Sequence, residues 1–398
     1  MKTALALFVS VLIFCLSLEA ISWALMPKRN AILDALKGPT VHEIDTWEKF
    51  LTHPRFARMT GMLGKFRAAH PELLKLPEFD YPLLFEDDDF QNNGESNRSP
   101  FYRGEDLNPN VDDFYSYRGA SSGKLKFRVR YATDENGFRR TPFTGRRPER
   151  ENLILMGCSF TFGHGVNQEE TFAATLAREF PDRNVFNFGI PASSVANILK
   201  RIYKRQADFF RTVPKDSPTD VVFTFIDDHM RRILGNSEFL AKLPHAFELE
   251  MYFYLDGDGR LQHLENFSKA PSRYVLRAYG HTNFARFTGI ELPLISTDEL
   301  RLTARLFREL RDQVRTYVPR LRKFYVAIYP GNNAVFPALR DFLKAEGIEF
   351  IDYSELDYQR LLNWHENLVV DYHPSAIAHE LYGKMLAEDL RSLETRER

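Results

Sequence analysis

The sequence predicts an α/β domain built on a parallel sheet, beginning at Glu151. From that residue onward, short apolar runs alternate with stretches whose apolar residues have helical spacing. The runs are almost continuously apolar, as strands are when both faces of their sheet are covered. Hydrophobic residues make up 44% of the 398-residue chain, enough for a sizeable core. We therefore expect a parallel sheet with helices on both faces.

The expected elements alternate along the chain. The strands are predicted at residues 152–158, 184–188, 220–226, 323–329 and 349–353. The helices are predicted at 168–180, 195–210, 297–318, 336–346 and 375–393. The longest departure, at about 235–294, contains two strand-like runs around Asp256-Gly257-Asp258-Gly259. Such turn residues favour a tight antiparallel connection, so an inserted hairpin is predicted there, within a domain that spans residues 151–395.

Residues 27–150 are predicted to be an irregular lead-in to this domain. Apolar residues at 46–70 have helical spacing, and residues 85–100 form an acidic, turn-rich stretch. Residues 124–141 alternate basic and apolar side chains and then reach Asn136-Gly137. That pattern predicts a hairpin or an edge strand.

Residues 1–26 are predicted to be a membrane anchor or a signal segment. Residues 3–26 are largely apolar, with Glu19 as the one charge, and about 20 such residues can cross a bilayer as a helix. An uncleaved anchor is favoured over a cleaved signal peptide, and a buried helix is the third alternative. The expected location is thus membrane-anchored and extracytoplasmic, or secreted if the segment is cleaved. Basic residues at both ends leave the orientation open.

The net charge and the cysteine count limit the classes of partner and cofactor that the sequence predicts. The net charge is −1, so the chain lacks the basic balance typical of nucleic-acid binding. Its two cysteines, Cys15 and Cys158, predict neither a disulfide nor a zinc site. No cofactor or metal is expected, and the oligomeric state stays open.

Residues able to do chemistry follow the predicted strands, where the carboxyl ends of a parallel sheet collect functional groups. Ser159 ends the first strand in "GCSFTFG", on a turn that suits either a nucleophile or an ordinary helix cap. Gly189 ends the second strand, where a glycine allows close approach of a ligand or simply a turn. Each residue therefore has both a catalytic and a structural interpretation.

Two further stretches combine acids with histidines. The third strand is followed by five ionisable residues that either contact substrate or cap the next segment through ion pairs: Asp227, Asp228, His229, Arg231 and Arg232. Asp371 and His373 precede the last helix, two residues apart, so an extended chain would place them on one side. The alternative is a capping aspartate with a surface histidine. His379, on the helix itself, is expected to be structural.

Together these stretches resemble the SGNH (GDSL-like) hydrolase family. "GCSFTFG" is similar to the nucleophile block, "NFGIPASS" to the glycine block and "DYHPSAIAHELYG" to the closing histidine block, in the family's order. The upstream "NGFR" and the apolar N-terminus are similar to membrane-anchored bacterial members. The resemblance covers about residues 151–393 and implies a three-layer α/β/α, flavodoxin-like fold.

The resemblance also implies roles for individual residues. Ser159 would be the nucleophile, His373 the general base and Asp371 its orienting carboxylate. The oxyanion hole would use the backbone N–H groups of Ser159 and Gly189 and the third-block residue. That residue is Asp227 where the family has asparagine, and an ionised carboxylate cannot donate a hydrogen bond. Two other departures are Cys158 in place of the aspartate beside the nucleophile and the short acid–histidine spacing.

The predicted function is a serine esterase or deacylase acting on an O-acylated small molecule or a cell-envelope glycan. One alternative is an O-acyltransferase to an envelope polysaccharide that uses the same triad. Another is a non-catalytic binding protein on the same scaffold, which Asp227 favours. The membrane is the other expected partner, through the N-terminal segment.

Overall fold

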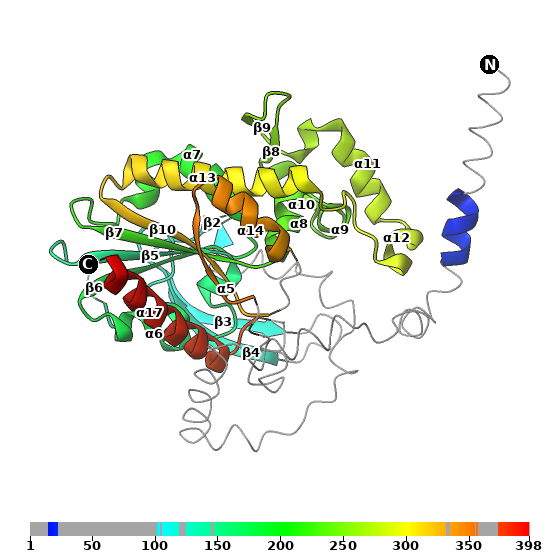
Figure 1. Cartoon of the computed structure of the whole chain (residues 1–398). Helices are drawn as coiled ribbons and strands as arrows, with labels where there is room; N and C mark the ends of the chain where they lie inside the picture. Colours follow the sequence, from blue (N-terminus) through cyan, green and yellow to red (C-terminus); the bar gives the residue numbers. More distant parts are fainter. Residues whose placement is uncertain are drawn as a thin grey trace. The chain divides into compact units, whose positions relative to one another are not determined.

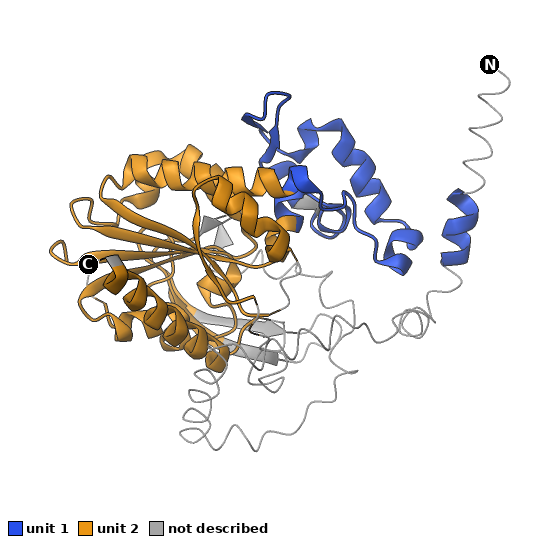
Figure 2. Cartoon of the chain, viewed as in Figure 1, with its two compact units in different colours: residues 1–48, 231–299 blue, residues 49–230, 300–398 orange. Residues whose placement is uncertain are grey.

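The computed structural model describes residues 15–22, 102–103, 106–118, 125–144, 147–331, 335–354, 356 and 373–397. The helix predicted at 46–70 and the acidic stretch at 85–100 lie outside these residues. The chain divides into two compact units (Figure 2). The first comprises residues 1–48 and 231–299, and the second comprises residues 49–230 and 300–398.

The second unit contains a five-stranded sheet in which all neighbouring strands are parallel. In chain order its strands are β5 (Glu151–Gly157), β6 (Arg183–Gly189), β7 (Thr219–Phe225), β10 (Leu321–Ile328) and β11 (Glu349–Asp352). Their order across the sheet is β6-β5-β7-β10-β11. Counted along the chain this is 2-1-3-4-5, the flavodoxin-like order. The predicted parallel sheet is confirmed, and each predicted strand is found within two residues of its expected bounds.

Burial explains why these strands are nearly continuous apolar runs. Every residue of β6 and β7 is buried, and so is every residue of β5 after Glu151. In the register, Ile154 of β5 lies between Phe186 of β6 and Val221 of β7. Side chains therefore pack on both faces of the sheet, which leaves no solvent face to enforce polar alternation.

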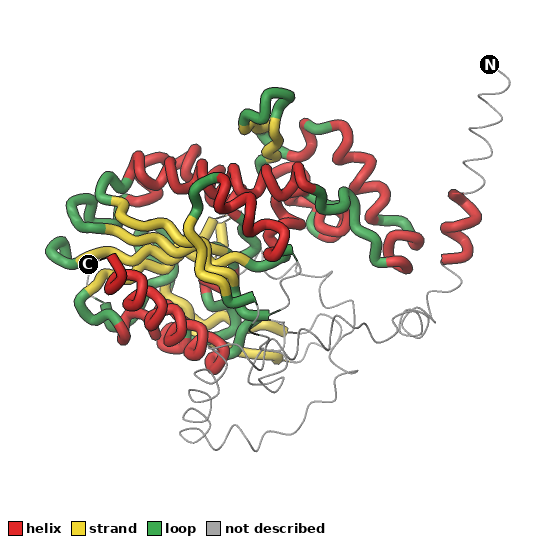
Figure 3. The backbone as a smooth tube through the Cα atoms, viewed as in Figure 1, coloured by secondary structure: helices red, strands yellow, loops and turns green. Residues whose placement is uncertain are grey.

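Helices cover both faces of this sheet (Figures 1 and 3). One face carries α6 (Phe172–Glu179) and α17 (Ala376–Glu397). The other carries α7 (Val195–Arg205), α13 (Thr297–Tyr317) and α14 (Phe336–Ala345). Short 3-10 turns, η6 (Gln168–Glu170) and η7 (Gln206–Phe210), occupy the ends of two predicted helices.

The lead-in contributes two small antiparallel pairs before the sheet. They are β1 (Tyr102–Arg103) with β2 (Asp106–Leu107), and β3 (Asp112–Arg118) with β4 (Leu125–Ala132). A turn follows β4, in which the Asp134 N–H donates to the Phe138 carbonyl at 2.7 Å. Arg139, just after this turn, bridges Asn187 of the edge strand β6. The predicted hairpin around Asn136-Gly137 thus forms and reaches the sheet.

The first unit is mostly helical. It contains most of α8 (Asp228–Leu234), followed by α9 (Ser237–Lys242), α10 (Pro244–Leu249), β8 (Tyr252–Leu255), β9 (Leu261–Leu264), η8 (Phe267–Lys269), α11 (Pro271–Gly280) and α12 (Asn283–Thr288). The predicted hairpin is β8–β9 and accounts for only part of the segment at 235–294. Helices of one or two turns show too few repeats of the helical period for the sequence to reveal them.

Part of the N-terminal apolar segment belongs to the first unit. Residues 15–22 are helical, and both oxygens of Glu19 accept backbone N–H bonds from α12, from Asn283 at 2.6 Å and Phe284 at 2.9 Å. In the described part of the chain, we find no helix with the length and apolar character needed to cross a bilayer. Residues 1–14 and 23–26 of the predicted anchor lie outside that part.

Candidate active site

Ser159 lies where strand β5 turns into the one-turn helix α5 (Ser159–Phe162). Gly157 ends the strand at φ +147°, and a Cβ there would lie 2.3 Å from Thr161 Oγ1, so only glycine fits this turn. The chain leaves β5 toward β6 and leaves β7 toward β10, in opposite directions across the sheet. Ser159 therefore lies at the topological switch point, where sheets of this kind bind ligands.

His373 meets Ser159 across 214 residues of sequence. Its Nε2 lies 2.8 Å from Ser159 Oγ, within the range that general-base catalysis needs. In the tautomer protonated at Nδ1, Nε2 accepts the hydrogen bond from the serine hydroxyl. His373 stands just before α17, where Ser375 Oγ accepts the N–H of Ala378 at 3.2 Å and holds the helix start.

Aromatic rings enclose the His373 imidazole. The ring of His164 lies 4.5 Å away between centroids, and that of Phe160 lies 5.7 Å away. Both residues belong to the turn that carries Ser159. Ser159 keeps 6% of its surface exposed and His164 keeps 8%. The serine hydroxyl is therefore largely shielded from solvent, whereas the His373 imidazole stays partly exposed.

Arg139 stabilises the turn that carries Ser159 by hydrogen bonding to its backbone carbonyls. The motif "NGFR" did not reveal this role by itself. Its side chain is 2% exposed, and its Nη1 and Nη2 donate to the carbonyls of Phe162 and Val166 at 2.8 Å each, with a further bond to Gly163. Its guanidinium lies over the Tyr131 ring, 4.5 Å from the centroid. The arginine thus donates to carbonyls at and just beyond the end of α5, where the helix itself supplies no donors.

Gly189 lies against the turn for a packing reason. A Cβ on it would approach the Phe162 backbone nitrogen to 2.2 Å, so a larger residue would push α5 away from β6. The Gly189 N–H donates to Asn187 Oδ1 at 3.0 Å. In this state the predicted oxyanion donor is therefore engaged by a neighbouring side chain.

The turn after Gly189 contains Ala192, a residue that the sequence analysis did not single out. Ser193 N–H donates to the Ile190 carbonyl at 3.2 Å, and Ala192 at the third position has φ +59°. This is the geometry of a type II turn, which favours glycine there. A non-glycine residue held in this region costs on the order of 1–3 kcal/mol, and such strain clusters at functional sites.

Asp227 follows β7, and its Oδ2 accepts the backbone N–H of Val335 at 3.3 Å. It therefore acts as an acceptor and ties together the segments that follow β7 and β10. His229 is fully buried, and its ring centroid lies 5.5 Å from the ring centroids of Phe223 and of Phe225. Asp228 begins α8.

Two predicted site residues are not placed by these contacts. Arg232 belongs to the first compact unit, and Asp371 lies outside the described residues. The structure thus brings Ser159 and His373 together, and the partner proposed to orient the imidazole stays a prediction. Among the described side chains, no three of His, Cys, Asp or Glu gather closely enough to hold a metal ion.

His379 lies inside α17 and is completely buried. Its Nδ1 accepts the N–H of Phe172 at 3.4 Å, which requires an unprotonated nitrogen. Burial, helped by the positive charge of Arg139 and by the neighbouring imidazole of His373, lowers the pKa of His379 to about 3. The residue therefore stays neutral at ordinary pH and joins α17 to α6.

Comparisons with known proteins find similarity only at the level of structure. No protein-family model matches the sequence, and no curated protein matches it. Similar solved structures include a lipolytic protein of the G-D-S-L family from Desulfitobacterium hafniense, with 14% identity over 60% of this chain and 99% of that chain and a TM-score of 0.32. A member of the same family from Veillonella parvula has 12% identity over 59% and 96%, with a TM-score of 0.34.

An acetyl xylan esterase from Butyrivibrio proteoclasticus is also similar, with 10% identity over 62% of this chain and 64% of that chain and a TM-score of 0.33. Identities and TM-scores this low do not fix an activity, so the chemistry has to come from this chain's own residues.

Proposed function

We propose that this protein is a serine hydrolase of the SGNH type that cleaves ester bonds. The observation that carries the proposal is the 2.8 Å contact between Ser159 Oγ and His373 Nε2 at the switch point of a parallel sheet. A serine hydroxyl becomes an effective nucleophile when an adjacent imidazole accepts its proton. This pair of atoms has the separation that such a transfer needs.

The reaction would proceed in two halves. In the first, Ser159 Oγ attacks the ester carbonyl carbon while His373 Nε2 takes the hydroxyl proton. The resulting imidazolium then donates that proton to the departing alcohol, and an acyl-serine ester remains. In the second half, His373 deprotonates a water molecule that attacks this ester, and the proton returns to Ser159 as the acid leaves. We assign Asp371 to orienting the imidazole.

The oxyanion needs donors near Ser159. The backbone N–H of Ser159 is one candidate, and that of Gly189 is a second once a ligand displaces its bond to Asn187. We do not assign Asp227 as a donor because its carboxylate accepts a bond from Val335. The substrate class that we propose is an O-acylated small molecule or glycan, acted on outside the cytoplasm. The apolar N-terminal segment supports that location.

A fluorophosphonate probe tests the proposal directly, because it phosphonylates only a serine that an adjacent base activates. We expect the full-length protein to be labelled at Ser159, as located by peptide mass spectrometry, and to hydrolyse p-nitrophenyl acetate. Ser159→Ala and His373→Gln should lose both activities. Ser193→Ala, at a buried serine after β6, is the matched control and should keep them. An unlabelled but correctly folded wild-type protein would contradict the proposal.

A further inference from the structure

His164 places an aromatic ring against the base of the proposed active site. Its ring centroid lies 4.5 Å from that of His373, and the two ring planes are inclined at 50°. The ring of Phe160 also contacts the imidazole but is more distant, at 5.7 Å. His164 is buried, whereas His373 is partly exposed. The reaction described above gives His164 no role, although it is the closer of these two rings.

Two glycines fix the backbone on either side of His164. Gly163 has φ +82° and Gly165 has φ +84°, values in the left-handed region that favours glycine. A Cβ on Gly163 would lie 2.6 Å from Thr171 Cγ2, so no side chain fits there. The Gly163 carbonyl accepts a hydrogen bond from the buried Arg139. His164 therefore belongs to a tight loop with little conformational freedom.

Backbone hydrogen bonds tie this loop directly to the nucleophile. The N–H groups of Gly163 and His164 donate to the Ser159 carbonyl at 2.9 and 3.0 Å. The N–H of Gly165 donates to the Tyr131 hydroxyl at 2.8 Å. The position of the His164 ring is therefore fixed relative to Ser159.

A histidine that acts as a general base has to keep one ring nitrogen aimed at the nucleophile. The His373 ring can turn about its side-chain bonds, and such a turn would move Nε2 from its place 2.8 Å from Ser159 Oγ. A ring packed against the imidazole restricts that rotation, because the two rings cannot occupy the same space. A misplacement of about 1 Å at a reacting group can cost about a hundredfold in rate.

We propose that His164 is a positioning residue that holds the His373 imidazole in the orientation in which Nε2 meets Ser159 Oγ. It acts through the body of its ring, since ring packing is the contact between the two side chains. The proposal rests on the ester hydrolysis proposed above, in which His373 carries the proton. A ring without nitrogen atoms should therefore replace His164, whereas a side chain without a ring should not.

Variants of the full-length chain test this proposal. His164→Ala removes the ring, and His164→Phe keeps a ring without its nitrogen atoms. His263→Ala is the matched control, because His263 also packs on an aromatic ring, that of Phe253 at 5.7 Å in the first unit. Hydrolysis of p-nitrophenyl acetate gives kcat and KM, and thermal unfolding checks that each protein is folded.

We expect His164→Ala to lower kcat by about tenfold to a hundredfold. KM should stay the same, because acylation and deacylation both depend on His373 and slow together. His164→Phe should recover kcat to within about threefold of wild type, and His263→Ala should equal wild type. If His164→Ala does not fold, His164→Gln takes its place as a longer side chain without a ring.

Nuclear magnetic resonance of histidine rings labelled with nitrogen-15 reports on His373 without requiring activity. The signals of His373 are identified by their loss in His373→Gln. We expect wild type and His164→Phe to give one narrow set of His373 signals. In His164→Ala that set should broaden or shift, because the imidazole samples more orientations.

Either a wild-type kcat or unchanged His373 signals in His164→Ala would overturn the proposal. A kcat of His164→Phe as low as that of His164→Ala would also overturn it, because a nitrogen of His164 would then be required. A wild-type protein without esterase activity or fluorophosphonate labelling would instead refute the proposed function. The His373 signals of the variants would still decide whether His164 holds the ring.

Discussion

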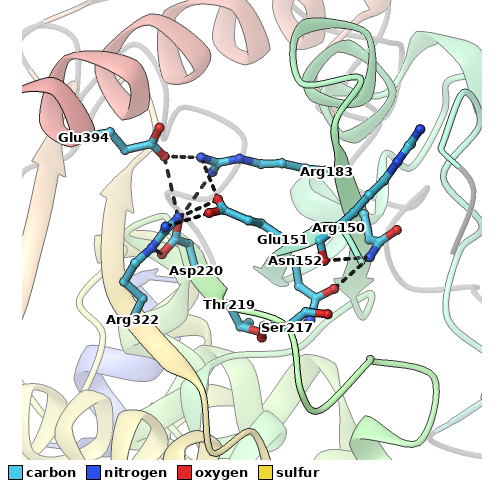
Figure 4. Close-up of polar contacts among 10 residues, drawn as sticks. Arg150, Glu151, Asn152, Arg183, Ser217, Thr219, Asp220, Arg322 and Glu394 are labelled. Atoms are coloured by element: carbon cyan, nitrogen blue, oxygen red, sulfur yellow. Dashed lines mark hydrogen bonds and ion pairs between the residues drawn. The ribbon is translucent and has the colours of Figure 1, made fainter. Parts of the chain in front are cut away.

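The two ends of the strands in the central sheet differ in how their charged residues are paired. We call the end where the strands begin the amino edge and the end where they finish the carboxyl edge. At the amino edge, Asp220 contacts Arg183 at 3.3 Å and Arg322 at 2.6 Å, and Arg322 also reaches Glu151 at 2.9 Å (Figure 4). Glu394 of α17 joins Arg183 in the same network. Each charge there is neutralised by an opposite charge within salt-bridge distance.

At the carboxyl edge, the residue pair that matters is a neutral hydroxyl and an imidazole. Ser159 and His373 share a hydrogen bond with a proton that can move, and the nearby Asp227 accepts from a backbone amide. An ion network stabilises because its charges are fixed, whereas a nucleophile and its base need a transferable proton. In this sheet, the amino ends of the strands therefore carry a stabilising ion network, and the carboxyl ends carry the reactive residues.

The largest expected effect is on activity at the carboxyl edge. Ser159→Ala and His373→Gln should each lower kcat for ester hydrolysis by about a thousandfold or more, and the double variant should lose little beyond either one. The two groups act as a unit, so their effects do not add. Steady-state kinetics of the four proteins measure this, with thermal unfolding as the check on folding. Losses that multiply in the double variant would show that the residues act independently.

The next largest effect is on stability at the amino edge. Asp220→Asn leaves the buried Arg183 with a weakened partner and should cost about 3–5 kcal/mol of unfolding free energy. Glu349→Gln, which breaks the exposed contact of Lys323 with Glu349, is the matched control and should cost at most about 1 kcal/mol.

Urea unfolding measures both stability changes, and kcat of the folded Asp220→Asn protein should equal that of wild type. If kcat falls as much as stability does, the two edges are not separate in function.

Asp227→Asn removes one charge at the carboxyl edge and tests whether an amide at that position raises activity. An asparagine keeps an oxygen to accept the Val335 N–H and adds an N–H donor. Because one oxyanion donor is worth about 2.7–4 kcal/mol, we expect kcat to rise by about a hundredfold to a thousandfold. Asp228→Asn is the control and should leave kcat unchanged. A fall in kcat at position 227 would mean that the reaction needs a carboxylate there.

The smallest expected effect concerns His379, which lies in α17. That helix begins beside His373 at the carboxyl edge and carries Glu394 at the amino edge. The pKa of His379 is lowered to about 3 in the folded protein, chiefly by burial, and is near 6.5 when the chain unfolds. Between these values only the unfolded chain binds the proton, so stability should fall as pH drops below 6.5. The slope is about 1.4 kcal/mol per pH unit for one proton.

Urea unfolding at a series of pH values measures that slope. His379→Gln should reduce it by about one proton between pH 6 and 4, whereas His263→Gln, at an exposed site in β9, should not. An unchanged slope in His379→Gln would mean that His379 becomes protonated in the folded protein.

The sequence by itself determined where the strands and most of the longer helices lie. The strand predicted at 152–158 is Glu151–Gly157, and the helix predicted at 297–318 is Thr297–Tyr317. Both patterns are local, since burial on two faces gives a continuous apolar run and an amphipathic helix repeats every 3.6 residues. Ser159 and His373 were also identifiable, because each lies in a motif that resembles a known family.

Tertiary structure alone decided how these parts meet. No local pattern states that β5 lies between β6 and β7, or that Arg139 braces the turn that carries Ser159. The short helices α9 and α10 also escaped detection, because they form against the core of the first unit rather than from a long periodic pattern. Helix α12 escaped as well, because its six residues are too few to show the helical period. The 2.8 Å contact between Ser159 and His373 depends on the packing of α17 against the sheet. Contacts between distant residues depend on how the entire core packs, and a linear pattern of residues does not specify that packing.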